Sequence, residues 1–216
     1  AKFGGVFSSG SGANEDSYKY LTNYSVQEYL KYADTLTVVR VMAGAYGPAS
    51  AAVTASGVNA NSFTLTTLSD GADQNSIGPH GVNGLLASGS ANNIRYEVTN
   101  VNNAKGTFTL LIRRGNDTNR RKTILEQYNN LTLDPRSPNY IARAIGDQVQ
   151  TLRAAGTADP FLQLSGSFPN RSRYVRVDVH RTTYNYLDEN GNVRDAALSS
   201  SLPSATSGSF SGGSDG

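Results

Sequence analysis

The sequence predicts an α/β (α+β) fold, in which a mixed β-sheet carries flanking helices. Three features indicate this class: a helical pattern at 25–33 that leads directly into an apolar run at 35–44, several segments with period-two alternation, and a second helical pattern within 133–148. A helix followed so closely by an apolar strand favours an α/β layer over a sandwich of two sheets.

The first helix is predicted over 25–33 (SVQEYLKYA). Ser25 followed by Glu28 is a capping box, in which each side chain accepts a hydrogen bond from the other residue's backbone N–H. Apolar residues then recur on one helical face, at Val26, Tyr29, Leu30 and Ala33. The run 35–44 (TLTVVRVMAG) is rich in β-branched residues and ends at a glycine, which is typical of a strand buried on both faces.

Alternation of apolar and polar residues predicts three strands in the middle of the chain, at 61–68, 94–99 and 107–113. The expected inward residues are Phe63 and Leu65, then Ile94, Tyr96 and Val98, then Phe108, Leu110 and Ile112. In the second strand Arg95, Glu97 and Thr99 take the other face. Residues 69–92 are rich in Gly, Asn and Ser and predict a long loop, of a kind that is often functional.

The segment 133–148 (LDPRSPNYIARAIGDQ) is predicted to turn into a helix, with Asp134 or Ser137 as N-cap and Gly146 as the stop. Its apolar stripe would be Ile141, Ala144 and Ile145. One or two further helical turns are expected within 148–155.

Towards the C-terminus, 174–180 alternates and predicts a strand with Val175, Val177 and Val179 inward and an edge open to pairing. Asn190-Gly191 predicts a tight turn.

The predicted organisation begins with an irregular lead at 1–19. A core domain segment follows at 20–148 and contains the long loop at 69–92. Residues 149–198 are expected to form a β-containing additional or inserted segment, and the Ser/Gly-rich residues 199–216 a flexible linker or loop. Because residue 1 is Ala and the last residues are of low complexity, we expect a segment of a longer chain.

Composition excludes several classes of function. The 216 residues include no Cys, which removes disulfides, thiolate nucleophiles and Cys-based metal sites. The net charge of +2, with 17% charged residues, gives no strong field for nucleic acid or an anionic membrane. Apolar content is 38%, below the roughly 45–50% of globular domains, so the core is expected to be thin or completed by neighbouring molecules. No apolar run approaches the ~18 residues of a membrane span.

No catalytic, cofactor or metal site is predicted. His80 and His180 are the only candidate general bases at neutral pH, and no nucleophile motif accompanies them, so both are expected in loops or on the surface. The oxygen-rich stretches 70–73 (DGAD) and 188–192 (DENGN) do not fit a calcium loop, and turn chemistry explains them. The Gly-rich opening lacks the Lys-Ser/Thr of a phosphate loop.

Two groups of basic residues stand out in the sequence. The first consists of Arg113, Arg114, Arg120, Arg121 and Lys122, with Asp117 among them; the second consists of Arg171, Arg173, Arg176 and Arg181, with Asp178. A solvated surface, an acidic patch on another protein subunit and nucleic acid are the three uses compatible with them. Nucleic acid is the least favoured, because the whole chain is nearly neutral.

A series of motifs, in order along 20–148, resembles the sheath protein of contractile phage tails. They are the run TLTVVRV, the stretch closing in NNIRYEV, the strand GTFTLLIRRG and, most specifically, LEQYNNLTLDPRSPNYIARAIGD. The resemblance covers about 60% of the chain. Residues 149–216 match less recognisably, and the terminal arms with which sheath proteins link neighbours are not identifiable.

The resemblance implies a sheath-type core domain with a subtilisin-like fold and no protease activity. It implies a structural virion protein that forms stacked hexameric rings around the tail tube, with the baseplate and tail terminator as further partners. Contraction of this helical assembly would drive the tube through the host envelope for genome ejection. Such a protein is assembled in the host cytoplasm and resides in the virion tail. On this basis we expect the Arg113–Lys122 group to face acidic surface on a neighbouring subunit or the tube.

Two other classes remain. A virion-displayed or secreted carbohydrate- or receptor-binding β-rich module would suit the twelve Tyr and the polar strands, whereas the helical patterns argue against it. A hydrolase on a subtilisin-like scaffold would need His80 or His180 beside an activated serine.

Overall fold

A computed structural model describes residues 7–9, 16–18, 21–37, 45–76, 78, 81–153, 156 and 159–215. The chain divides into two compact units, Ala1–Ala43 and Gly44–Gly216. Each unit is described by itself.

The smaller unit contains a short hairpin and one helix. Strand β1 (Phe7–Ser9) pairs antiparallel with β2 (Asp16–Tyr18), and helix α1 spans Leu21–Tyr29. The prediction that the helix starts at Ser25 is therefore wrong. A Ser-x-x-Glu pair caps a helix only when the serine is the N-cap residue and the residues before it are not helical, whereas 21–24 are helical. Residues 35–37 of the predicted strand at 35–44 are not in a strand, and 38–44 lie outside the described residues.

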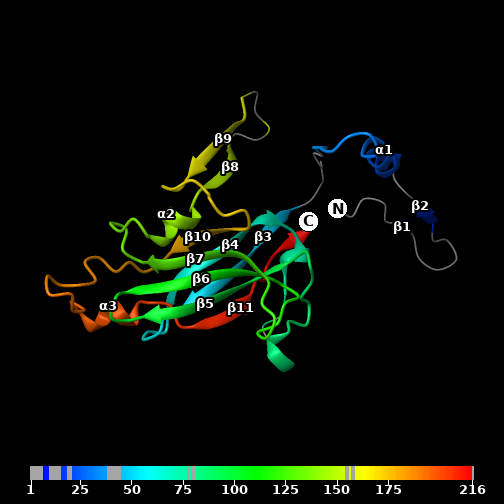
Figure 1. Cartoon of the computed structure of the whole chain (residues 1–216). Helices are drawn as coiled ribbons and strands as arrows, with labels where there is room; N and C mark the ends of the chain where they lie inside the picture. Colours follow the sequence, from blue (N-terminus) through cyan, green and yellow to red (C-terminus); the bar gives the residue numbers. More distant parts are fainter. Residues whose placement is uncertain are drawn as a thin grey trace. The chain divides into compact units, whose positions relative to one another are not determined.

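The larger unit is built on two four-stranded antiparallel sheets (Figure 1). The first has the order β10-β4-β3-β12, with β3 at Tyr46–Thr54, β4 at Asn61–Asp70, β10 at Val175–Val179 and β12 at Ser214–Asp215. The second has the order β11-β5-β6-β7, with β5 at Ile94–Asn102, β6 at Thr107–Arg114, β7 at Ile124–Thr132 and β11 at Thr206–Ser209.

The two sheets pack face to face around one core. The ring of Phe63 on β4 stacks on that of Phe108 on β6, with centroids 5.8 Å apart, and both side chains are fully enclosed. The described fold is mixed but strand-rich, with several antiparallel sheets, so the predicted mixed α+β class is confirmed. The narrower expectation of an α/β layer in preference to a sandwich is wrong. That expectation depended on a strand at 35–44, which the described residues 35–37 do not form.

The alternating segments are confirmed as strands. Those predicted at 61–68, 94–99, 107–113 and 174–180 correspond to β4, β5, β6 and β10, and their predicted inward residues are buried, except that Val179 is half-buried. Strand β3 was not predicted, although Ala49, Ala51 and Val53 alternate along it and are buried. Within its described residues, the connection between β4 and β5 contains two short 3-10 turns, at Ala72–Gln74 and Val82–Gly84.

Helix α2 (Ile141–Ile145) is shorter than the sequence predicted, and Tyr140 is its N-cap rather than Asp134 or Ser137. Those two side chains instead accept hydrogen bonds from Arg136 N–H and Asn139 N–H in the preceding turns. Gly146 ends the helix as predicted, with φ of 112°, a conformation that a residue with a Cβ rarely adopts.

The expected helical turns at 148–155 are wrong for 148–153, and 154–155 lie outside the described residues. Residues Val149–Arg153 form strand β8, which pairs antiparallel with β9 (Phe161–Ser165) in a separate two-stranded sheet.

The C-terminal segment differs from the flexible linker expected at 199–216. Helix α3 (Ala196–Ser200) leads into β11, which pairs with β5, and β12 then pairs with β3. Between them Phe210 is fully buried, with its ring 6.1 Å from that of Tyr96 in an edge-on arrangement. This segment therefore crosses from one sheet to the other and belongs to the sandwich. The Asn190-Gly191 turn is confirmed, with the Gly191 N–H donating to Asp188 O at 3.1 Å.

Candidate interaction surface

A buried ion-pair network lies on the side of the β5–β6 pair that faces away from the core. The Arg113 guanidinium, fully enclosed, donates from Nη2 to Asp117 Oδ1 at 2.7 Å and from Nε to Asp117 Oδ2 at 2.8 Å. Its Nη1 donates to Glu97 Oε2 at 2.9 Å. This bidentate pairing with one carboxylate and a further bond to a second makes Arg113 the centre of the network.

Arg95 is the second buried cation and sits directly opposite Arg113 in the β5–β6 register. Its Nη1 donates to Gly84 O at 2.6 Å and lies 3.6 Å from Asp117 Oδ1. Burial, followed by the neighbouring charge of Arg113, lowers the pKa of Arg95. Within the described residues its Nε and Nη2 have no hydrogen-bond partner, so Asp117 is the main compensation for this charge.

The network fixes the two loops that cover it. Asp117 Oδ2 also accepts the Thr123 N–H at 2.9 Å, which closes the β6–β7 loop around the carboxylate. The Asn119 N–H of that loop donates to Asn83 O at 2.6 Å, and Arg95 holds the neighbouring Gly84. The long β4–β5 connection is thus tied at its middle to the sheet and to the next loop.

Outside this buried base, the two loops present a mixed apolar and cationic surface. Val82 is 83% exposed and Leu85 is 46% exposed, and Arg120 and Arg121 are exposed on the β6–β7 loop. We call these four residues the loop surface. Arginine beside exposed aliphatic side chains is a composition typical of protein interfaces, and no ion pair within the described part of the chain involves Arg120 or Arg121.

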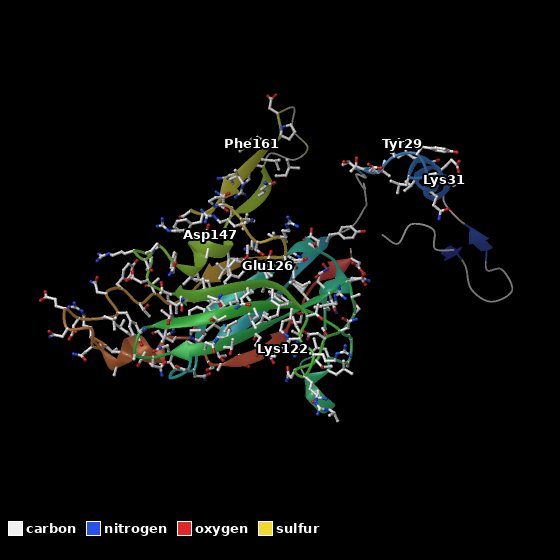
Figure 2. All side chains as sticks on the ribbon, in the orientation of Figure 1. Tyr29, Lys31, Lys122, Glu126, Asp147 and Phe161 are labelled. Atoms are coloured by element: carbon white, nitrogen blue, oxygen red, sulfur yellow. The ribbon has the colours of Figure 1, made fainter. Side chains whose placement is uncertain are left out.

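The first basic group predicted from the sequence is therefore divided. The expectation that Arg113 faces a partner is wrong, because it is buried against Asp117, and Lys122 Nζ is paired with Glu97 Oε1 at 2.7 Å (Figure 2 labels Lys122). Arg114, Arg120 and Arg121 remain exposed. The alternation placed Arg95 correctly off the core face, but no signal in β5 itself showed that distant loops bury it.

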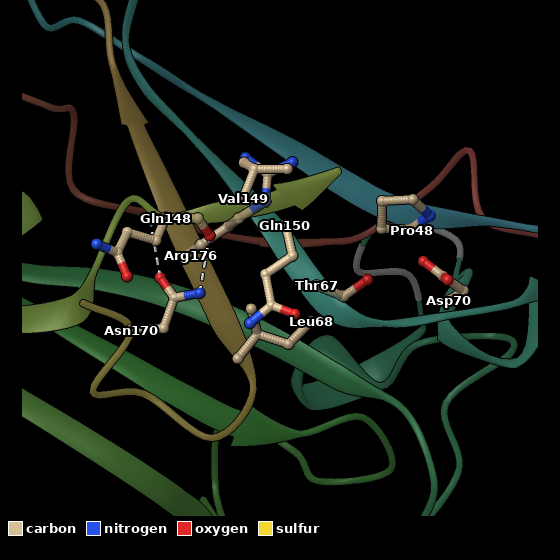
Figure 3. A pocket seen from close by; sticks show the side chains of 9 residues that line it. All are labelled: Pro48, Thr67, Leu68, Asp70, Gln148, Val149, Gln150, Asn170 and Arg176. Carbon is tan, nitrogen blue, oxygen red and sulfur yellow. Dashed lines mark hydrogen bonds between the residues drawn. The ribbon is translucent and has the colours of Figure 1, made fainter. Parts of the chain in front are cut away.

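The second basic group is also divided. Arg171 and Arg173 are exposed, whereas Arg176 and Arg181 are half-buried. Arg176 lines a pocket of about 420 Å³ between the sandwich and the β8–β9 hairpin, shown in Figure 3. The other residues lining it are Pro48, Thr67, Leu68, Asp70, Gln148, Val149, Gln150 and Asn170.

The candidate catalytic and metal-binding residues do not form a cluster. His180 is exposed, with Nε2 2.8 Å from Thr64 Oγ1, and His80 lies outside the described residues. Asp188 accepts hydrogen bonds from the Asn192 and Asn190 N–H groups, which lower its pKa and account for the acidic 188–192 stretch as a turn. The described ranges contain no group of three or more His, Asp or Glu side chains that could hold a metal ion.

Several tyrosines are perturbed by burial without forming a site. Burial, with the nearby Glu126 carboxylate, raises the pKa of Tyr128 to about 12. Burial likewise raises the pKa of Tyr96, Tyr140 and Tyr186. These four hydroxyls are therefore neutral at physiological pH. The hydroxyls of Tyr96, Tyr128 and Tyr186 donate hydrogen bonds, and the Tyr140 ring packs on Phe168.

None of the helices in the described part of the chain has the length and apolarity needed to cross a membrane. Comparison with protein-family models, with curated proteins and with solved structures gave no match to this chain.

Proposed function

We propose that this protein is a structural subunit of a contractile tail sheath, which polymerises as stacked hexameric rings around a tail tube. The observation that carries this proposal is the run 131–147 (LTLDPRSPNYIARAIGD), the most specific element of the resemblance. On this proposal the protein has no catalytic site and needs no cofactor. Its partners would be other copies of the chain, the tube, the baseplate and the terminator of a virion tail.

The position of this run in the fold supports the proposal. It leads from β7 into α2, and Leu133, Tyr140, Ile141 and Ile145 are all buried in the core. Leu133 O also accepts the Thr183 N–H at 3.0 Å, which ties the run to the segment after β10. The run begins at the end of the edge strand β7, and its apolar side chains cover the core at that edge. This packing role gives a physical reason why the run has this sequence. The sheath-type, subtilisin-like core implied by the resemblance remains part of the proposal, and the antiparallel ladders described above do not add support for it.

The loop surface supports an assembly role independently of the motif. It is held by a buried network, so the backbone that carries its exposed arginines and aliphatic side chains loses little conformational freedom on binding. We propose that it faces acidic surface on a neighbouring subunit or on the tube.

Electron microscopy of the purified protein, alone and with a tail tube as template, tests the function. Hollow tubes or stacked rings with six-fold symmetry are the expected result. Particles that stay monomeric at high concentration, both with and without the tube, would count against a sheath subunit.

The second candidate function is a displayed or secreted module that binds a carbohydrate or a receptor. The face-to-face pair of antiparallel sheets favours it, because loops at the end of such a sandwich are common binding sites. Saturable binding on a glycan array by a protein that never polymerises would establish this alternative.

Reversing the charge of the loop surface is expected to impair assembly. In the double variant Arg120→Glu/Arg121→Glu, the critical concentration for tube formation should rise at least about tenfold, since two close charge pairs are each worth on the order of 1 kcal/mol. Light scattering against protein concentration measures this. The matched control is Arg171→Glu/Arg173→Glu, which makes the same change of net charge at exposed residues elsewhere. An equal effect of both double variants would show that net charge, not the loop surface, is responsible.

A further inference from the structure

The β8–β9 hairpin projects from the larger unit on a firmly fixed base. At that base the Asp147 N–H donates to Phe168 O at 3.1 Å, and Asp147 Oδ1 accepts the Phe168 N–H at 2.6 Å. One step further, Asn170 Oδ1 accepts the Gln148 N–H and its Nδ2 donates to Gln148 O. Figure 2 shows Asp147 at the foot of the hairpin and Phe161 far along it. The hairpin therefore has a defined orientation.

One face of the hairpin is formed largely by leucines. Cross-strand partners share a face, and the register pairs Leu152 with Leu162 and Gln150 with Leu164. Leu152, Leu162 and Leu164 are 54%, 65% and 57% exposed, so the described part of the chain leaves more than half of each residue uncovered. Gln150, on the same face of the hairpin, lines the pocket in Figure 3 together with Leu68 of β4. We call Leu152, Leu162 and Leu164 the leucine face.

The exposed area indicates a contact that is weak by itself. Three leucines a little over half exposed offer on the order of 300 Å², against ~800 Å² for each partner in a stable pairwise complex. A two-stranded sheet is also only marginally stable alone, so it gains from being covered. Such a contact becomes effective where each molecule makes several contacts at once, as in a polymer of identical copies.

We propose that the leucine face of one copy of this chain packs on the loop surface of a second copy. The two surfaces lie at opposite ends of the larger unit, as Figure 1 shows for the hairpin and the 3-10 turn at Val82–Gly84. A contact between different surfaces propagates from copy to copy, whereas a hairpin packed on a hairpin would close a dimer. This inference rests on the proposed function, which supplies identical copies as neighbours.

The chemistry of the two surfaces is complementary. Val82 and Leu85 supply aliphatic area for the leucine face. Arg120 and Arg121 beside them match Asp159, an exposed carboxylate just before β9, which has no ion pair within the described residues. Apolar contact in the centre with a charged pair at the rim is the usual anatomy of a protein interface.

The absence of cysteine allows a direct test with two single-cysteine variants, Leu162→Cys and Val82→Cys. After mixing under assembly conditions, a short thiol crosslinker should join the two variants to each other in clear excess over either homodimer. The matched control replaces Val82→Cys by Thr54→Cys, which is exposed on β3, and should give only background crosslinking. Dominant Leu162→Cys homodimers, or heterodimers no more frequent than in the control, would overturn the inference.

Assembly provides the second readout. The double variant Leu152→Ser/Leu162→Ser should raise the critical concentration for tube formation about tenfold or more, while Gln163→Ser on the opposite face should leave it unchanged. The unfolding midpoint of the Leu152→Ser/Leu162→Ser variant should stay that of the parent, because both leucines are more than half exposed. If the parent forms tubes and the leucine variant forms them equally well, the inference fails and the proposed function stands. If the parent never forms rings or tubes, the proposed function itself fails.

Discussion

Replacing Asp117 by asparagine is expected to lower the free energy of unfolding by about 3–5 kcal/mol, because it leaves buried positive charge without its partner. Asparagine keeps the shape of the carboxylate but removes the charge that faces Arg113 at 2.7 Å and Arg95 at 3.6 Å. Glu97 would then be the one remaining carboxylate paired with Arg113 among the described residues, and it is shared with Lys122. Chemical denaturation at neutral pH, followed by circular dichroism, measures the change.

The control for this prediction is Asp73→Asn, which removes an exposed carboxylate from the same unit and should change the unfolding free energy by less than about 0.5 kcal/mol. A second variant separates charge from shape. Adding Arg95→Met to Asp117→Asn removes one of the two orphaned cations, so part of the lost stability should return. A loss of less than about 1 kcal/mol in Asp117→Asn would show that the network contributes little net stability.

Loss of this network should also affect the loop surface. Asp117 holds Thr123, and Arg95 holds Gly84, so the positions of Arg120 and Val82 depend on the same buried charges. For that reason, going from the parent to the Asp117→Asn variant should accelerate amide hydrogen exchange more in both loops than in β4. The position of the loop surface thus depends on buried residues that are not part of that surface.

The strands that the sequence predicted are those with large apolar residues at alternate positions. Phe63 and Leu65, or Phe108, Leu110 and Ile112, contrast strongly with their polar neighbours, and β4 and β6 follow directly from that contrast. Strand β3 alternates as well, but its buried residues include Ala49 and Ala51, whose small side chains give little contrast with serine or threonine. Burial in this sandwich depends as much on partners far along the chain as on the local pattern.

The candidate site was predicted only in part. The basic composition of 113–122 drew attention to the β6–β7 loop, but composition could not separate the buried Arg113 from the exposed Arg120 and Arg121. That separation depends on Asp117, which folds back over the strand, and on Glu97 from the neighbouring strand. The leucine face was missed because 148–155 was interpreted as helix, and its strand pairing becomes apparent only with β9.

The C-terminal segment shows why a Ser/Gly-rich composition does not by itself mean flexibility. Strands β11 and β12 are held by backbone hydrogen bonds, which need no particular side chains. Gly208 is required by close packing, since a Cβ there would lie 2.7 Å from the hydroxyl oxygen of Tyr96. Small residues thus allow this segment to lie tightly on β5, and Phe210 then anchors it in the core.

Truncating that anchor, in Phe210→Ala, is expected to cost about 3–5 kcal/mol of unfolding free energy. The Phe210 side chain is fully buried and packs edge-on against Tyr96, so its removal leaves a cavity between the two sheets. The backbone here is anchored as well, because Phe210 O accepts the Ser76 N–H of the β4–β5 connection at 2.8 Å and the adjacent Ser211 bridges to Ser50 on β3. Thermal and chemical unfolding of the variant measure the loss.

Ser207→Ala is the matched control, because it lies on β11 with its side chain half-exposed and should change stability by less than about 0.5 kcal/mol. A flexible tail would tolerate both changes equally, so similar midpoints for Phe210→Ala and Ser207→Ala would contradict a structural role for 206–215. If instead only Phe210→Ala destabilises the protein, the low-complexity C-terminus is part of the folding unit. Any assembly that uses this sandwich then requires the segment to be folded, because β11 forms the edge of the four-stranded sheet in which β5 carries Arg95 and β6 carries Arg113.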